Sequence, residues 1–96
     1  MQTDTLQPLV LKVLREVQEL SGRPWSVIRS DAKPIGALDG FDSLAAIEAT
    51  VMIEEKLGCK IDVDSVFVSD DGMHALTLEQ VCERLATLVT AIEGET

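Results

Sequence analysis

Residue types on which many binding and catalytic sites depend are scarce in this sequence. Its 96 residues include one histidine, two cysteines and no tyrosine, and aromatic residues make up 3% of the chain. One histidine and two cysteines without a Cys-x-x-Cys pair leave no recognisable zinc ligand set. The few aromatic residues leave little surface for stacking on nucleobases or sugars. Two cysteines do not make a disulfide framework, so we expect Cys59 and Cys82 to be reduced thiols.

Basic residues are also few. The chain has eight Lys and Arg against seventeen Asp and Glu, which gives a net charge of −9. Long-range repulsion then opposes binding to nucleic-acid phosphates or anionic membranes and favours basic protein partners or cations. Most of the acidity lies late in the chain, because residues 39–96 carry thirteen acidic and three basic groups.

Long apolar runs are absent. We therefore expect no signal peptide, no membrane span and a cytoplasmic protein. Hydrophobic residues still make up 46% of the chain, which indicates a folded protein rather than a solvated acidic tail. The length predicts a single domain over residues 1–96.

Apolar periodicity and helix-stop signals predict an all-α, four-helix bundle with three long helices and one short one. Gly22 and Pro24 end the first helix, Gly58 ends the second, and the sequence from Thr77 to Gln80 has capping-box spacing. Leu20 is predicted to join the apolar stripe of the first helix, and Trp25, Val27, Ile28 and Leu38 to hold the long loop on the core. The predicted elements are a helix at about 5–21, a loop at 22–42, a helix at about 43–57, a short helix at about 64–68 and a last helix at about 77–92.

The predicted 43–57 helix has two contrasting faces when its residues are placed at 100° intervals. One face carries Ala46, Ala49, Thr50, Ile53 and Leu57, which suits packing against the other long helices. The opposite half carries an apolar stripe bordered by glutamates: Ser43, Leu44, Ile47, Glu48, Val51, Glu54 and Glu55. Two interpretations remain open, a helix buried on both sides or a docking face on which the acids steer basic partners.

Ser43 stands at the predicted start of this helix, directly after Asp42. Either residue can be an ordinary N-cap, since Ser and Asp are both favoured there. Alternatively, the Ser43 hydroxyl is modified. A phosphate ester at this position lies near free backbone amides and the positive end of the helix dipole, and Asp42 could bind a metal ion or position a modifying enzyme.

The sequence resembles the acyl carrier proteins in this region and across nearly the whole chain. The resemblance is carried by Gly40-Phe41-Asp42-Ser43-Leu44, by Ile47-Glu48 and by the run from Ile53 to Leu57. It implies that Ser43 carries a 4′-phosphopantetheine arm, transferred from coenzyme A by a phosphopantetheinyl transferase. The arm ends in a thiol that holds acyl or aminoacyl groups as thioesters, and the carrier itself is not an enzyme.

The resemblance also implies the partners and their contacts. Asp42 and Leu44 would flank the modified serine and contact the transferase, and Glu48, Val51 and Glu55 match the recognition helix of the family. Together with Ile47 and Glu54 they form the predicted partner-binding set. The expected partners are the transferase, an acyl- or aminoacyl-activating ligase or an acyltransferase, and downstream synthases or tailoring enzymes with basic docking patches. The carrier is expected to act as a monomer.

Two departures from the family pattern indicate a carrier of specialised metabolism. Ala45 stands where carriers of fatty-acid synthesis commonly have an acid, and residues 66–76 form a longer connection than usual. A housekeeping carrier of fatty-acid synthesis is the alternative.

Two functions outside this family fit the sequence less well. A serine hydrolase built on Ser43 and His74 lacks the Gly-x-Ser-x-Gly elbow. A calcium-binding protein is suggested by Asp62-Val63-Asp64, which begins like an EF-hand loop. Val66 and Phe67, however, occupy the next ligand and glycine positions of such a loop.

Overall fold

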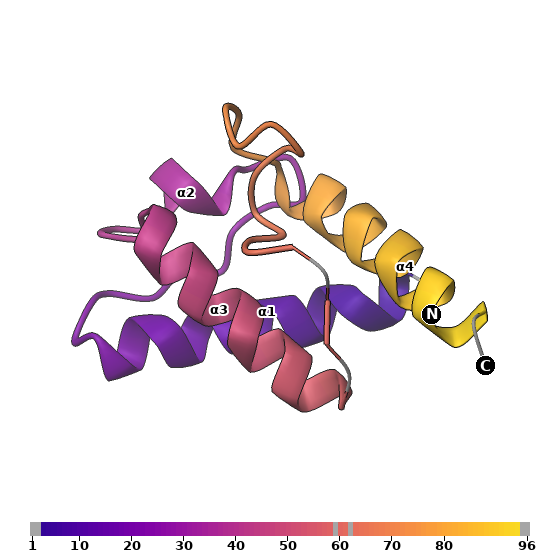
Figure 1. Ribbon diagram of the computed structural model, residues 1–96. Helices are drawn as coiled ribbons and strands as arrows, with labels where there is room; N and C mark the ends of the chain where they lie inside the picture. The colour runs from indigo at the N-terminus through magenta and orange to yellow at the C-terminus, as the bar shows by residue number, and fades with distance from the viewer. Residues whose placement is uncertain (1–2, 59, 62, 95–96) are drawn as a thin grey trace.

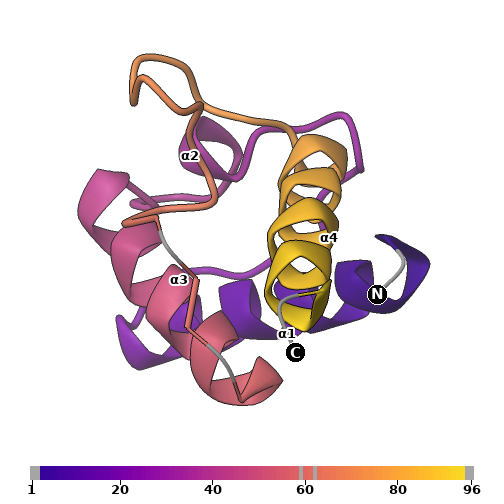
Figure 2. The same cartoon turned by 45° about the vertical axis from the view of Figure 1, so that its right-hand side comes forward.

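The computed structural model describes residues 3–58, 60–61 and 63–94 and is helical. The helices are α1 (Thr3–Leu20), α2 (Pro34–Ala37), α3 (Ser43–Leu57) and α4 (Leu78–Gly94). Helix α1 packs against both α3 and α4, which lie across it in Figures 1 and 2. The fold is an all-α, acyl-carrier-protein-like bundle of three long helices and one short one, and the described residues contain no strand. None of the described helices combines the length and apolar character needed to cross a membrane.

Helix α1 supplies much of the core through a stripe at helical spacing. Its fully or almost fully buried apolar residues are Leu6, Val10, Val13, Leu14 and Val17. The prediction that Leu20 continues this stripe is wrong, because Leu20 lies in the last turn and is 81% exposed. Gln18 is buried instead, and its Nε2 donates to the carbonyls of Pro24 (3.0 Å) and Asp39 (2.8 Å). A buried polar side chain therefore holds both ends of the following loop on the helix.

The loop after α1 contains the short helix of the bundle, α2, whereas the sequence analysis predicted the short helix at about 64–68. Helix α2 is one irregular turn, since Gly36 has a φ of +110° and Ile35 a non-helical ψ of 107°. Leu38 is buried, and Trp25 and Ile28 are partly buried against the core. The prediction that Val27 also anchors the loop is wrong, because its side chain is exposed.

The predicted short helix at 64–68 is absent, and bends and turns take its place. Two of its backbone groups bond to residues outside the segment, and the Phe67 N–H bonds to the Ser65 hydroxyl within it (3.2 Å). The Val66 N–H donates to Thr50 Oγ1 of α3 (3.2 Å), and the Phe67 carbonyl accepts from the Leu76 N–H (2.9 Å). Ile61, Val66 and Phe67 are buried. Figures 1 and 2 both show this segment running between α3 and α4, so it fills the space that a helix would otherwise occupy.

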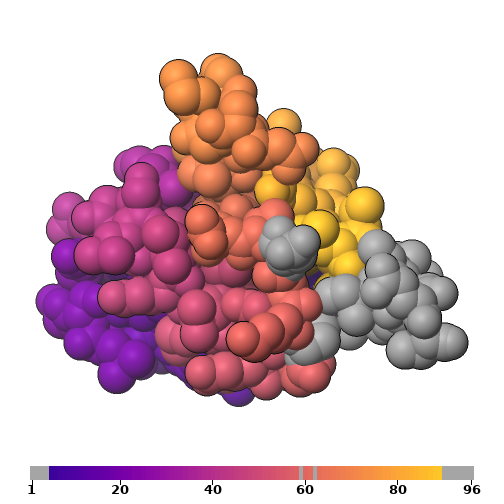
Figure 3. All heavy atoms as spheres, viewed as in Figure 1, coloured from indigo at the N-terminus to yellow at the C-terminus, as the bar shows by residue number. Residues whose placement is uncertain are grey.

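Residues 66–76 fold back on themselves as a small hairpin, closed by an isolated antiparallel bridge between Val68 and Ala75. Inside this 66–76 hairpin, the Ser69 N–H donates to the His74 carbonyl (2.8 Å). Asp71 Oδ1 accepts from the Ser69 hydroxyl and from the Met73 N–H, and these hydrogen bonds lower the pKa of Asp71. The tip rises above the body of the molecule in Figure 3, where it is drawn in orange.

The ends of α3 and α4 follow local signals in the sequence. Helix α3 ends at Gly58, which has a φ of +71° and donates its N–H to the Glu54 carbonyl (2.9 Å). The capping box at the start of α4 is confirmed. The Gln80 N–H donates to Thr77 Oγ1 (3.2 Å), and the Thr77 N–H donates to Gln80 Oε1 (2.9 Å).

Gly40 offers a test of the loop that precedes α3. It has a φ of +71°, and a Cβ there would lie 2.6 Å from Arg23 Nε. Gly72 has a similar φ of +72° with nothing near its Cβ position. In urea denaturation, we expect Gly40→Ala to lower the free energy of unfolding by about 1 kcal/mol more than Gly72→Ala, because Arg23 must also give up its hydrogen bond to Gly40. Equal losses would contradict this account.

Candidate functional site

Two consecutive residues set the position of Ser43 at the start of α3. Phe41 is buried and meets Phe67 edge to face, with ring centroids 5.5 Å apart at 72°. Asp42 is extended (φ −108°, ψ −171°), and its Oδ1 accepts the Ala45 N–H at 3.0 Å. Asp42 is therefore the N-cap. Ser43 follows as the first helical residue and is exposed, so its hydroxyl is not needed to cap the helix.

The backbone before Ser43 is held from α1 and from the turn that follows it. Gln18 Nε2 donates to the Asp39 carbonyl, and Arg23 Nη1 donates to the Gly40 carbonyl. These two side chains fix the end of the loop just before the site. Ser43 therefore stands on a well-anchored backbone although it follows a loop of about twenty residues.

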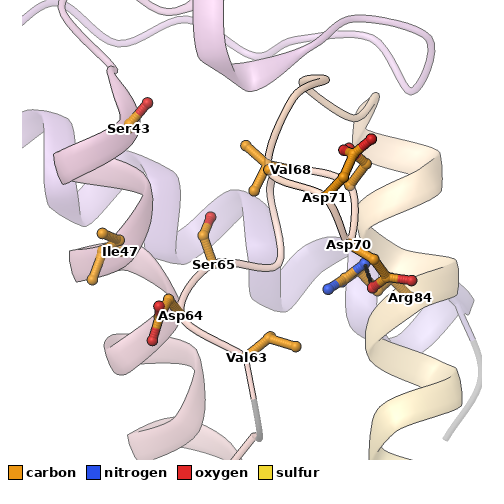
Figure 4. A pocket seen from close by; sticks show the side chains of 11 residues that line it. Ser43, Ile47, Val63, Asp64, Ser65, Val68, Asp70, Asp71 and Arg84 are labelled. Atoms are coloured by element: carbon orange, nitrogen blue, oxygen red, sulfur yellow. Dashed lines mark hydrogen bonds and ion pairs between the residues drawn. The ribbon is translucent and has the colours of Figure 1, made fainter.

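Ser43 lines a cavity of about 380 Å³, shown in Figure 4. Its walls come from the start of α3, from the connection between Val63 and Gly72, and from Arg84 on α4. Ile47, Val63 and Val68 give it an apolar lining. Sequence reasoning missed this cavity and Arg84 within it. One feature of the sequence could have drawn attention to this residue, because Arg84 is the only arginine after residue 38.

The outer face of α3 carries an exposed apolar stripe. Leu44, Ile47 and Val51 are 66%, 41% and 46% exposed, and Glu48 and Glu55 beside them are exposed as well. The opposite face is buried through Ala45, Ala46, Ala49, Thr50 and Ile53. The interpretation of α3 as a helix buried on both sides is therefore wrong. We call Leu44, Ile47, Glu48, Val51 and Glu55 the outer face of α3.

Glu54, the remaining member of the predicted partner-binding set, has a contact within the chain. It is half-buried, and its Oε2 accepts the Ile61 N–H at 2.8 Å. This hydrogen bond holds the segment after α3 against the helix. Leu57, predicted to lie on the buried face, is partly buried and packs against the core.

The other candidate chemistries gain no support from the geometry. His74 is exposed in the 66–76 hairpin, with its Nδ1 3.9 Å from Asp71 Oδ1, and does not line the cavity of Ser43. Among the described residues, no group of three or more His, Cys, Asp or Glu side chains could hold a metal ion. Asp62, the first residue of the EF-hand-like run, lies outside the described residues.

Cys82 is a core residue of α4 rather than a reactive thiol. It is 1% exposed, and burial together with the negative charge of Glu83 raises its pKa to about 11. It therefore stays protonated near neutral pH, in a form that is a poor nucleophile. Cys59 lies outside the described residues.

A family model described as the phosphopantetheine attachment site matches residues 12–85. This match covers well over half of the sequence and includes all of α3. The chain belongs to this family. Members are carriers rather than enzymes, and they hold 4′-phosphopantetheine covalently. No curated protein and no solved structure gave a significant match.

The cap of α3 in this carrier can be separated from any contact that Asp42 makes with a partner. Asn caps helices about as well as Asp, whereas Ala does not. We expect Asp42→Ala to lower the free energy of unfolding by about 1 kcal/mol, and Asp42→Asn to leave it nearly unchanged. Urea denaturation followed by circular dichroism measures both. A loss in Asp42→Asn as large as in Asp42→Ala would show that the charge, not the cap, stabilises the fold.

Proposed function

We propose that the chain is a discrete carrier in which Ser43 holds the phosphopantetheine arm and presents acyl or aminoacyl thioesters to partner enzymes. The observation that carries this proposal is an exposed serine hydroxyl at the start of α3, beside a cavity, on a backbone fixed by Phe41 and Asp42. Ser65 and Ser69 also line the cavity, but Ser65 is buried and the Ser69 hydroxyl donates to Asp71.

Loading is a phosphoryl transfer. Ser43 Oγ attacks the phosphorus that bears the pantetheine group of coenzyme A, and a new Oγ–P bond forms. The P–O bond of the pyrophosphate breaks, adenosine 3′,5′-bisphosphate leaves, and the hydroxyl proton passes to a base on the transferase. The phosphodiester then lies near the N-terminus of α3, whose dipole stabilises its negative charge. Asp42 opposes that charge, which suits a role in contacting the transferase or a cation bound to it.

The outer face of α3 is the proposed docking surface. Its exposed apolar stripe supplies contact area, and Glu48 and Glu55 attract basic patches on the transferase, the loading enzyme and the downstream enzymes. Glu54 contributes charge while it holds the Ile61 N–H. The same charges repel the outer face of a second copy, which supports a monomer. We place this carrier in the cytoplasm, together with coenzyme A and these enzymes.

Two features favour specialised metabolism over fatty-acid synthesis. Ala45 is 6% exposed. Carriers of fatty-acid synthesis commonly have an acid at this position, directly after the leucine that corresponds to Leu44, and such an acid would be desolvated in this packing. The 66–76 hairpin adds a structured projection beside the cavity that carriers with a shorter connection lack. A partner adapted to this hairpin would distinguish the carrier from a housekeeping one.

Replacement of the proposed attachment residue gives the simplest test. Incubation with coenzyme A and a promiscuous transferase is expected to add one phosphopantetheine to the wild-type protein and none to Ser43→Ala, as read by intact mass. Ser26→Ala, at an exposed loop position, should load normally. Ser43→Ala should unfold at nearly the same urea concentration as wild type, because Asp42 supplies the cap. A mass gain in Ser43→Ala would assign the arm to another residue.

Charge reversal on the outer face tests the docking surface. We expect Glu48→Lys to lower kcat/KM for loading about tenfold at low salt, and the difference to shrink as salt screens the exposed charges. Glu19→Lys changes the net charge equally but lies on α1 in an exposed pair with Arg15, so it should have little effect. An equal loss in both variants would indicate that net charge, not the outer face, governs recognition.

A further inference from the structure

Arg84 is the basic side chain of the cavity that Ser43 lines. It lies on α4 and its side chain is 17% exposed, in contrast to exposed arginines such as Arg29 at 86%. Its Nε is buried and has no hydrogen-bond partner. A buried donor without a partner is costly, and one on a charged group is especially so. Arg84 therefore lines the cavity with a charged group whose hydrogen-bonding donors are not all satisfied within the protein.

Among the described residues, Arg84 forms one ion pair, and this pair uses only part of its guanidinium. Nη1 lies 2.7 Å from Asp70 Oδ1, and Asp70 is 94% exposed in the turn of the 66–76 hairpin. An ion pair with so exposed a partner contributes little, because water competes for the carboxylate. Nη2 has no hydrogen bond among the described residues, and together with Nη1 it forms the terminal edge of the guanidinium. That edge has the spacing of the two oxygens of a carboxylate.

We propose that this cavity receives a short acyl cargo that ends in a carboxylate, with the Arg84 guanidinium binding the carboxylate through its Nη groups. The inference rests on the proposed attachment of the arm to Ser43, from which the cargo enters. Figure 4 shows Ser43 and Arg84 on separate helices, with Val63, Ser65 and Val68 between them. The apolar side chains of Ile47, Val63 and Val68 suit the methylene groups of such a cargo, and about 380 Å³ suits a small one.

The acidic residues that line the cavity disfavour anions, and attachment to the arm offsets part of this cost. Asp64, Asp70 and Asp71 are exposed, so water and salt screen them, whereas Arg84 is mostly buried. Their charge disfavours free anions from solution. A cargo attached to the arm has an effective concentration of about the millimolar range, which favours its binding over that of a free anion.

The test compares two cargoes that differ in charge and by one methyl group. A transferase loads the wild-type protein from adipoyl coenzyme A, which ends in a carboxylate, or from its methyl ester, which is neutral. The rate of thioester cleavage by hydroxylamine then reports how far the cargo is sheltered. We expect the thioester of the adipoyl cargo to be cleaved about tenfold more slowly than the thioester of the methyl-ester cargo, because charge-assisted hydrogen bonds in a partly buried site would hold the adipoyl carboxylate. The Arg84 Nε–H resonance should shift with the adipoyl cargo alone.

Three variants assign the effect to Arg84. Arg84→Gln should abolish the difference between the two cargoes, and Arg29→Gln should retain it. Asp70→Asn removes the competing carboxylate and should slow cleavage of the adipoyl thioester further. This exposed substitution also decides the matter if Arg84→Gln does not fold.

Equal cleavage of the two cargoes in loaded wild-type protein would overturn this inference and leave the attachment of the arm intact. A loss of the difference in Arg29→Gln as large as in Arg84→Gln would also overturn it. Failure of the wild-type protein to load at all would overturn both the inference and the proposed function.

Discussion

The edge-to-face contact between Phe41 and Phe67 connects the two irregular segments that surround Ser43. Phe41 ends the long loop before α3, and Phe67 lies in the connection between α3 and α4. Because both rings are buried, each segment is held on the core by the other. The cap at Asp42 and the exposure of Ser43 follow directly in sequence. The cavity lies between the start of α3, this connection and α4, so its shape depends on where the contact holds the connection.

Three parts of helix α3 have different surroundings. Its buried face, with Ala45, Ala46 and Ala49, packs on the core, and its outer face is exposed to solvent. Its start opens onto the cavity through Ser43 and Ile47. Ile47 belongs to both the outer face and the cavity, so a partner that covers the stripe also contacts the wall of the cavity. In the proposed function, a domain of this size offers a surface for enzymes and a shelter for cargo.

The parts of the fold that depend on neighbouring residues could be predicted from the sequence. Helix α3 occupies the expected residues, since Asp42 and Gly58 are local start and stop signals, and Thr77 caps α4 as its spacing indicates. The absence of the 64–68 helix could not be predicted, because the hydrogen bond from Val66 goes to Thr50, sixteen residues away. The two faces of α3 could be drawn from angles, but the angles alone left open whether the half opposite the alanines was buried or exposed.

The candidate site shows the same division. Ser43 and the outer face were recognisable because their residues are close in sequence. Arg84 was not, because its cavity is assembled from α3, the connection and α4. The burial of Gln18 and the exposure of Leu20 were also hidden, since helical periodicity does not reveal which polar group the loop will use as a hydrogen-bond donor.

The attachment of the arm to Ser43 is the central claim, and fragmentation of the loaded wild-type protein in a mass spectrometer tests it most directly. The account predicts that every fragment ion containing residue 43 carries the added phosphopantetheine and that fragments lacking residue 43 are unmodified. A modification located at Ser65 or Ser69, or protein that remains unmodified with an active transferase and coenzyme A, would contradict it.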